Sequence, residues 1–479
     1  MKKYSHLRCF AFRSYFWLLV FVFHGLPSSA AIYEVGPGKE LAEIEAVPWE
    51  SLVAGDVVNI HWRAEPYRSK WVICRQGQVN KPIIVHGVAN PQGLLPVIDG
   101  RDAVTRKELN FWSETRAVIK IGGANKPADL MPQHIVIENL EIRSARPPFV
   151  FSGRNGKTAY DSNASALFIE KGEHIIVRNC VIHDSGNGLF SSYMAKDILI
   201  EKCFIYDNGI EGSILEHNSY TAAQGIMFQF NRYGPLRKGC LGNNLKDRSA
   251  GLIVRHNWLE GGNRQLDLVD AADSPILRDD PRYRSTWVYG NVLIEREGDG
   301  NSQIVHYGGD SNKKEWYRKG TLYFYNNTVV STRRSPTMIF RLSSGDEQVD
   351  CRNNIFYVTE AGPNLALLEG AGRVNLQYCW FKTGWVPTRG ELVGKITGQD
   401  GCRSGNDPSF LNIERQDFRL VASSPLLTGG INWPQGAQQF TQYYQSHRQA
   451  SDRKSTTPIP IGALGGIVGL PLDLEGKGF

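Results

Sequence analysis

Residues 225–233 read GIMFQFNRY, and residues 251–259 repeat the same pattern as GLIVRHNWL. Both follow apolar-x-apolar-x-x-Asn-x-apolar, a pattern in which Asn or Cys usually occupies the key position. The pattern recurs at intervals of 23 to 40 residues, which is typical of short strands stacked in a solenoid with loops of variable length. The key positions are Leu140, Cys180, Cys203, Asn231, Asn257, Asn291, Asn327, Asn354 and Cys379.

The apolar runs before the key positions predict short β-strands. Alternation over so few residues is a strand signal, and parallel strands one coil apart stack at roughly 4.8 Å. Asparagines repeated at one turn form amide ladders, and buried cysteines at that turn pack as small apolar groups, so we expect the key positions to be structural. The prediction is an all-β protein, a single parallel β-helix whose repeats occupy residues 134–381.

The flanking segments are expected to close the solenoid. Residues 31–133 contain β-rich runs separated by Gly and Pro, which predict an N-terminal cap and the first coils. We expect a helix over about residues 41–52, because the open end of a solenoid needs a cover against edge pairing. Residues 382–479 lack the pattern and are predicted to form an irregular C-terminal cap, with the Gln-rich stretch 435–454 as a loose excursion.

Residues 1–30 have the features of a secretory signal peptide. Four basic residues precede an apolar run from Tyr15 to Phe23, and small residues follow near Ala30. The apolar run is too short to span a bilayer. We therefore expect cleavage, export to the periplasm or the cell exterior, and no stable membrane insertion of the mature chain.

Charge and cysteine usage exclude several classes of protein. Without residues 1–30 the chain has 50 basic and 48 acidic residues, a net charge of +2 that gives no support for a nucleic-acid partner. Seven of the eight cysteines remain, and an odd number excludes a complete disulfide framework. The chain also lacks the C-x-x-C spacing of a structural zinc site.

The strands that follow the ladder turns must also stack, and their sequences place polar residues on neighbouring coils. Acids, bases and cations gathered on one open face are expected of a polysaccharide groove. The candidate residues are Glu216, His217, Asn218, Tyr220, Asn244, Lys246, Arg248, Arg264, Asp267, Asp270, His306 and Tyr307.

Several motifs resemble those of secreted right-handed parallel β-helix proteins of the pectate-lyase-like superfamily. They lie, together with the coil repeats, at residues 35–38 (VGPG), 54–58 (AGDVV), 97–100 (VIDG), 407–410 (DPSF), 423–425 (SSP) and 461–463 (IGA). The resemblance covers nearly the whole mature chain and implies the right-handed fold. It is weaker for the reaction, since the superfamily includes lyases, hydrolases, epimerases and non-catalytic proteins.

Residues 243–257 are similar to the base-bearing coil of chondroitinase-B-like and alginate-type polysaccharide lyases. The resemblance implies that Lys246 removes the proton at C5 of a uronic acid, while Arg248 or Arg264 neutralises the adjacent carboxylate. Tyr220 or His217 is the candidate donor of a proton to the departing glycosidic oxygen. The candidate substrate contacts are Arg264, Glu216, Asn218, Asn244, Asp267, Asp270, His306 and Tyr307.

Two features depart from that family. Its essential arginine lies on the coil after the lysine, where this chain has Asp267 and Asp270. Its acidic calcium ligands upstream of the lysine are missing, because residues 239–245 contain no carboxylate. We therefore predict no cofactor and no metal ligands. The resemblance allows Ca²⁺ as a cofactor, but this chain does not match the acidic ligands of the family.

The sequence thus predicts an exported, monomeric enzyme that acts on an acidic polysaccharide by β-elimination. Glycoside hydrolysis, polyuronate epimerisation and non-catalytic polysaccharide binding remain alternatives. Hydrolysis would use two carboxylates among Glu216, Asp247, Asp267 and Asp270. Asp267 and Asp270 would point to opposite faces of a regular strand, which weakens that particular pair.

Overall fold

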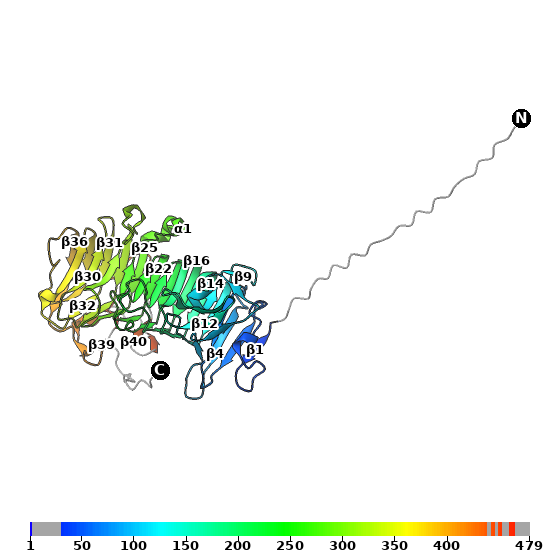
Figure 1. Ribbon diagram of the computed structural model, residues 1–479. Coiled ribbons are helices and arrows are strands. Elements are labelled where there is room, and N and C mark those ends of the chain that lie inside the picture. The colour runs from blue at the N-terminus through cyan, green and yellow to red at the C-terminus, as the bar shows by residue number, and fades with distance from the viewer. Residues whose placement is uncertain (2–29, 438–441, 446–448, 453–458, 465–479) are drawn as a thin grey trace.

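The computed structural model describes Met1 and residues 30–437, 442–445, 449–452 and 459–464. The predicted signal peptide lies almost entirely outside the described residues, as do parts of the Gln-rich stretch and residues 465–479. The chain winds into an elongated stack of parallel strands, with its N-terminal strands at one end and β36 at the other (Figure 1). Most coils contribute a strand to each of three sheets.

The first sheet contains the strands that precede the key positions. Ile226 pairs with Leu252 and Ile253 pairs with Trp287, so the predicted repeats are in register. The sheet consists of β1 (Ile32–Val35), β2 (Val57–His61), β4 (Ile83–Val88), β10 (Gln133–Glu138), β14 (Ser165–Arg178), β16 (Asn187–Glu201), β19 (Gln224–Gln229), β22 (Ala250–Arg255), β25 (Ser285–Tyr289), β28 (Thr321–Tyr325), β31 (Gln348–Arg352), β34 (Arg373–Gln377) and β36 (Lys395–Asp400).

The second sheet has 11 strands, nine of which follow the nine key positions. They are β5 (Val97–Asp99), β11 (Glu141–Arg143), β15 (Val181–His183), β17 (Phe204–Ile205), β20 (Arg232–Tyr233), β23 (Trp258–Glu260), β26 (Val292–Glu295), β29 (Thr328–Ser331), β32 (Ile355–Val358), β35 (Trp380–Lys382) and β37 (Arg403–Gly405).

The third sheet carries the candidate residues. It contains β3 (Ser69–Ile73), β8 (Ala117–Ile121), the first halves of β14 and β16, β18 (Ser219–Thr221), β21 (Leu245–Asp247), β24 (Leu266–Leu268), β27 (Gln303–Tyr307), β30 (Thr337–Leu342) and β33 (Leu365–Gly370). The long strands β14 and β16 run through both the third and the first sheet.

The remaining helices and strands are short. The single described α-helix, α1 (Pro275–Asp279), follows β24 and has Ser274 as its N-cap residue. The others are the strands β6 (Ala103–Thr105), β7 (Asn110–Phe111), β9 (Ala124–Lys126), β12 (Val150–Gly153), β13 (Gly156–Ala159), β38 (Phe410–Asn412), β39 (Asp417–Leu420), β40 (Gln442–Gln445) and β41 (Gln449–Asp452), and the 3-10 helices η1 (Ile44–Ala46), η2 (Glu114–Arg116), η3 (Pro281–Arg284), η4 (Lys314–Trp316), η5 (Gly362–Asn364) and η6 (Pro425–Leu427).

The helix expected over residues 41–52 is wrong. Only η1 is helical there, and Leu41 instead bridges to Val35. Pro48 explains the difference, because proline lacks an amide hydrogen and forces the preceding residue out of the helical region. Val47 is accordingly extended, with φ −67° and ψ 130°. Trp49 anchors the segment by stacking on Trp71 at a ring distance of 4.8 Å.

The predicted asparagine ladder is confirmed. Asn257 Oδ1 accepts hydrogen bonds from the backbone amide of Asn231 at 2.9 Å and from its side chain at 3.0 Å. Asn257 in turn donates to Asn291 Oδ1 at 3.0 Å, and the series continues through Asn327 to Asn354. Each buried asparagine side chain therefore hydrogen-bonds to the asparagine of the neighbouring coil, and these bonds fix the register of the stack.

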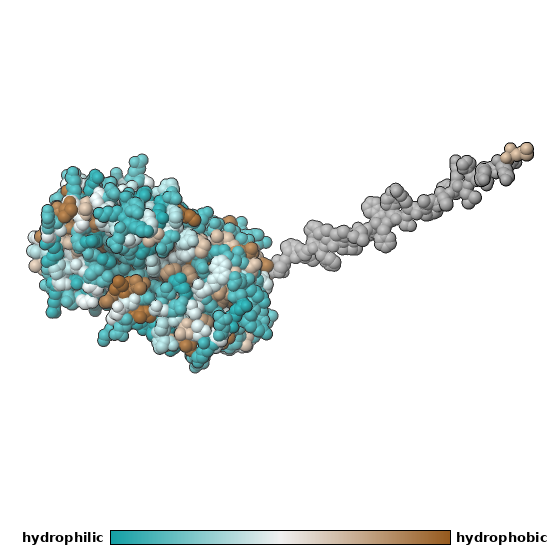
Figure 2. Space-filling view, turned by 45° about the horizontal axis from the view of Figure 1, so that its top comes forward, coloured by the Kyte–Doolittle hydropathy of each residue, from teal (hydrophilic) through white to brown (hydrophobic). Residues whose placement is uncertain are grey.

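The stack begins before and ends after the segment in which the repeats are visible in the sequence. At its far end β34 pairs with β36, and β35 pairs with β37. Residues 459–464 lie beside the central coils, where Ala463 N donates to Thr328 Oγ1 at 3.0 Å. The face of the molecule in Figure 2 is mainly hydrophilic, with small, separate hydrophobic patches.

Candidate functional site

The third sheet aligns one column of side chains across successive coils. Tyr220 pairs with Lys246, and Lys246 pairs with Asp267. Asp267 pairs with His306, which pairs with Arg341. Residues at equivalent positions of parallel strands project from the same face, so these side chains lie beside one another. The predicted gathering of Tyr220, Lys246, Asp267 and His306 is thus observed.

Lys246 lies between two carboxylates. Its Nζ is 2.6 Å from Asp267 Oδ2 and 2.6 Å from Asp310 Oδ2, and the residue is 8% exposed. Burial disfavours the charged amine, but the two carboxylates outweigh burial and raise the pKa of Lys246. Lys246 is therefore a cation at neutral pH.

The two carboxylates are correspondingly ionised. Burial opposes the charge on Asp267, but Lys246 and a hydrogen bond from His306 hold its pKa well below the ordinary value. Asp310 is also partly buried, and Lys246 and Arg248 lower its pKa. Neither carboxyl group holds a proton that it could donate at neutral pH.

Arg248 connects the phenol of Tyr220 to the loop after β27. Its Nε donates to Tyr220 Oη at 2.9 Å, and its Nη2 donates to Asp310 Oδ1 at 3.0 Å. Asp270 Oδ1 accepts the backbone amide of Asp310 at 2.7 Å, so Asp270 holds that loop. The guanidinium remains charged, because burial is outweighed by Tyr220 and Asp310, which raise the pKa of Arg248.

Asp267 is the centre of a second group of contacts. His306 Nδ1 lies 2.7 Å from Asp267 Oδ1, and Asn243 Nδ2 donates to Asp267 Oδ2 at 2.8 Å. Arg264 lies 3.6 Å from Asp267 Oδ1 and donates from Nε to Gln303 at 2.9 Å. The other ring nitrogen of His306 is 2.9 Å from Ser343 Oγ. Arg264, predicted to neutralise the substrate carboxylate or to contact substrate, thus belongs to the cluster.

His217 is a buried neutral imidazole. Burial and the positive charge of Lys246 lower the pKa of His217 to about 3. Its Nδ1 accepts the backbone amide of Asn243 at 2.8 Å, which leaves the hydrogen on Nε2. The ring meets Tyr220 edge to face at 5.3 Å. His217 therefore positions Tyr220 and is unsuited to the predicted role of proton donor.

Four residues predicted to contact substrate are fully buried. Asn218, Asn244, Asp270 and Tyr307 are each 0% exposed. Asn218 donates to Asn244 Oδ1 at 2.7 Å, and Asn244 donates to the carbonyls of Glu260 and Gly261, so the two form a second internal ladder. The predicted role of all four in substrate binding is corrected, because no substrate atom can reach them. Glu216 is also buried, at 3% exposure.

Sequence reasoning missed Asp310, Asn243 and Ser343. Asp310 follows Gly308-Gly309 directly after β27, and this pair of glycines at a strand end was the available signal for a functional loop. Gly308 has φ +132°, and a side chain at Gly309 would meet the ring of Tyr317 at 2.0 Å. The backbone here accepts only glycine, and this conformation turns Asp310 back onto Lys246 and Arg248.

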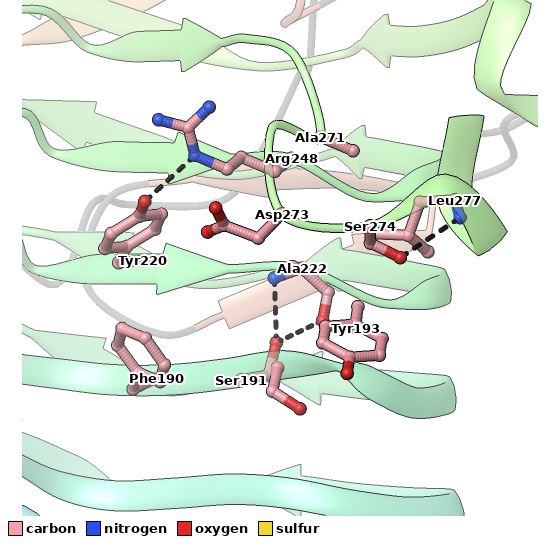
Figure 3. A pocket seen from close by; sticks show the side chains of 11 residues that line it. Phe190, Ser191, Tyr193, Tyr220, Ala222, Arg248, Ala271, Asp273, Ser274 and Leu277 are labelled. Carbon is pink, nitrogen blue, oxygen red and sulfur yellow. Dashed lines mark hydrogen bonds between the residues drawn. The ribbon is translucent and has the colours of Figure 1, made fainter. Parts of the chain in front are cut away.

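A pocket of about 190 Å³ adjoins Tyr220 and Arg248. Figure 3 shows Phe190 and Tyr220 on one side of it and Ser274 and Leu277, from the start of α1, on the other. The pocket and the ionic cluster share the same open face of the third sheet, so a bound chain can contact both.

The described residues contain no group of three or more His, Cys, Asp or Glu side chains arranged to hold a metal ion. Lys246 fills the space between Asp267 and Asp310 that a cation would need.

Among the described helices, none has the length and apolar character needed to cross a membrane.

One family model matches part of the chain. The family model "Right handed beta helix region" matches residues 97–279. A search of curated protein sequences finds no match.

Similar solved structures include pectate lyase Pel9A, with a TM-score of 0.46 and 11% identity over 92% of this chain and 98% of that chain. The alginate lyase from Paenibacillus sp. str. FPU-7 has a TM-score of 0.38 and 10% identity over 74% of this chain and 92% of that chain. The GH136 lacto-N-biosidase from Eubacterium ramulus has a TM-score of 0.42 and 11% identity over 78% of this chain and 67% of that chain. The stacked parallel strands give the chain the parallel β-helix fold that its repeats predict, and the family model identifies residues 97–279 of it as similar to a right-handed β-helix region.

Proposed function

We propose that the chain is an exported enzyme that cleaves a uronic-acid-containing polysaccharide by β-elimination. The observation that carries the proposal is the contact between Arg248 Nε and Tyr220 Oη, beside the Lys246 cation on an open face. It supplies the two elements that elimination requires, a cation for the substrate carboxylate and a hydroxyl for proton transfer.

The reaction breaks the C5–H and C4–O4 bonds and forms the C4–C5 double bond and a new O4–H bond. The substrate carboxylate binds Arg248 and Lys246, which makes the proton at C5 more acidic. Tyr220 Oη, as the phenolate, takes the C5 proton, and the electron pair forms the C4–C5 double bond as the C4–O4 bond breaks. The proton on Tyr220 then passes to the departing O4.

This assignment changes the role predicted for Lys246. A lysine whose pKa is raised by two carboxylates is a poor base, but it is a fixed positive charge close to the reacting carboxylate. The cluster of Lys246, Arg248 and Arg264 is balanced by Asp267, Asp270 and Asp310. Substrate must therefore replace existing ion pairs, and Asp310, the most exposed of the three carboxylates, is the partner to be displaced.

Glycoside hydrolysis at this cluster is less favoured. A glycosidase needs one carboxylic acid that is protonated before the bond breaks. Asp267 and Asp310 both have lowered pKa values, so neither can serve as that acid. Epimerisation shares the first proton abstraction and differs only in returning a proton to C5.

The first experiment is a panel of uronic-acid polymers. Elimination produces an unsaturated sugar that absorbs in the ultraviolet, whereas hydrolysis gives new reducing ends without that absorbance. Epimerisation gives neither, and changes only the configuration at C5. New reducing ends alone, or no reaction on any polymer, would overturn the proposal.

Variants at Lys246 distinguish two roles for this residue, a fixed positive charge and a base. Arginine remains protonated and cannot act as a base, so Lys246→Arg should retain activity within about tenfold if Lys246 supplies charge. Lys246→Met should lose about 10²–10³-fold, and Tyr220→Phe about 10²–10⁴-fold. Lys196→Met is the control, since Lys196 pairs with Glu173 on the first sheet. An inactive Lys246→Arg enzyme with native stability would return the role of base to Lys246.

A further inference from the structure

The pocket beside Tyr220 has walls made mainly of apolar side chains. Phe190 and Tyr220 supply aromatic surface, and Ala222, Ala271 and Leu277 supply aliphatic surface. Ala271 and Leu277 belong to a small buried cluster with Ala250 and Tyr283, against which Ala222 packs. These contacts fix the wall formed by α1, so the shape of the pocket is built into the fold (Figure 3).

The serine hydroxyls in the wall are already engaged within the protein. Ser191 Oγ donates to the carbonyl of Ala222 at 3.0 Å and accepts the backbone amide of the same residue at 3.1 Å. Ser192 Oγ donates to the carbonyl of Glu170 and accepts the amide of Met194 at 3.2 Å. Ser274 Oγ caps α1 by accepting Leu277 N at 3.4 Å. An occupant rich in hydroxyl groups would therefore find few partners among these serines.

Asp273 is the charged residue of the wall that lacks a partner within the described part of the chain. Arg248 also lines the pocket, but its guanidinium is engaged by Tyr220, the carbonyl of Asp270 and Asp310. The carboxylate of Asp273 is exposed at the wall and has no ion pair among the residues that the structure describes. Figure 3 shows the carboxylate turned toward the side of the pocket that carries Tyr220 and Arg248. Since like charges repel at short range, a uronic acid is disfavoured at this position.

We propose that the pocket binds a neutral sugar residue with a methyl-terminated substituent, either an acetyl group or the methyl group of a 6-deoxy sugar. This inference rests on the proposed function, because the pocket adjoins the residues that would act on the uronic acid. The preferred substrate is then a polymer in which uronic acid alternates with such a neutral sugar. A homopolymer of uronic acid would place a carboxylate beside Asp273 and bind poorly.

The test compares three polymers with wild type and two variants. The polymers are a homopolyuronate, uronic acid alternating with an N-acetylhexosamine, and uronic acid alternating with a 6-deoxyhexose. A methyl group in an apolar pocket contributes about 10- to 200-fold to kcat/KM, so one alternating polymer should exceed the homopolymer by at least about tenfold. Which alternating polymer is preferred identifies the substituent.

The variants examine shape and charge separately. Ala222→Phe fills the pocket and should lower kcat/KM for the preferred polymer about tenfold or more, while the homopolymer value stays within about twofold. Asp273→Asn removes the repulsion and should raise the homopolymer value. Asp279→Asn, at the exposed end of α1, is the control and should change neither. Thermal unfolding of each variant checks that the fold is intact.

Binding measurements separate this inference from the proposed function. Calorimetry with oligosaccharides reports occupancy of the pocket even if no polymer is cleaved. Wild type should bind the preferred alternating oligosaccharide at least about tenfold more tightly than Ala222→Phe does. Equal binding by these two proteins, or equal affinity for the homopolymer and both alternating oligosaccharides, would overturn the inference. Cleavage of a homopolymer alone would overturn it while leaving the elimination proposal intact.

Discussion

The buried neutral state of His217 predicts a specific dependence of stability on pH. Its pKa is about 3 in the folded chain and 6.5 as an ordinary histidine. Between these values the unfolded chain binds one more proton than the folded chain, so stability falls as the pH falls below 6.5. Above pH 6.5 both states are neutral at this residue and the effect vanishes.

The size of the effect follows from the two pKa values. One pKa unit corresponds to about 1.4 kcal/mol, so His217 lowers the free energy of unfolding by up to about 5 kcal/mol between pH 6.5 and pH 3. Between pH 6 and pH 5 alone its share is about 1 kcal/mol. In this narrower window Asp267 stays ionised because its pKa is far lower.

The perturbation is His217→Gln, which keeps an acceptor for the backbone amide of Asn243 and cannot take up a proton. Urea unfolding is followed by tryptophan fluorescence at pH 7, 6 and 5, and the free energies of the two proteins are subtracted. The subtraction removes other groups, including Glu295, whose pKa burial raises to about 8. Wild type should lose about 1 kcal/mol more than the variant from pH 6 to pH 5.

The control is His174→Gln, since the side chain of His174 is 47% exposed. This variant should follow the wild-type dependence on pH. Identical pH dependence of wild type and His217→Gln between pH 7 and pH 5 would refute the reasoning, because it would mean that His217 titrates alike in the folded and unfolded chains.

Two further predictions concern the stability of the stack. Asn257→Ala removes the hydrogen bonds that Asn257 makes to the amide groups of Asn231 and to the carbonyl of Phe228. The free energy of unfolding should fall by about 1–3 kcal/mol for each buried group left unsatisfied, which a lowered urea midpoint would measure. A midpoint unchanged from wild type would contradict a structural role for the ladder. Arg318 is 0% exposed, pairs with Asp247 at 3.1 Å and donates to the carbonyl of Val269 at 3.0 Å, so Arg318→Met should cost about 3–5 kcal/mol in thermal or urea unfolding. Adding Asp247→Asn to that variant should restore part of the loss, and a double variant no more stable than Arg318→Met would show that the charge of Asp247 is not the cause.

The repeats made the coil architecture predictable because residues at equivalent positions of successive coils make the same kinds of contact. At the ladder turn, each asparagine hydrogen-bonds to the asparagine of the next coil. Asparagine therefore recurs at positions such as Asn231, Asn257 and Asn291, and this recurrence is visible in the sequence alone. The helix expected over residues 41–52 was wrong because the expectation rested on the need to cover the end of the solenoid, and Pro48 prevents a helix in that segment.

The candidate site was only partly predictable. Tyr220, Lys246, Asp267 and His306 lie on consecutive coils, so the register alone placed them together. Asn218 and Asn244 belong to the same segments, but they turn into the coil, and the sequence does not show where a strand begins relative to the turn before it.

The sequence by itself determined the repeated coil, its buried ladder and the alignment of polar residues on one face, because these depend on contacts between residues at equivalent positions. Only the tertiary structure decided the ionisation of those residues. Asp310 comes from a loop whose path is fixed by two glycines and by Asp270, and together with Asp267 it raises the pKa of Lys246 against the effect of burial. The charge on a buried group depends on its neighbours in space, and the neighbour that matters here lies 64 residues away along the chain.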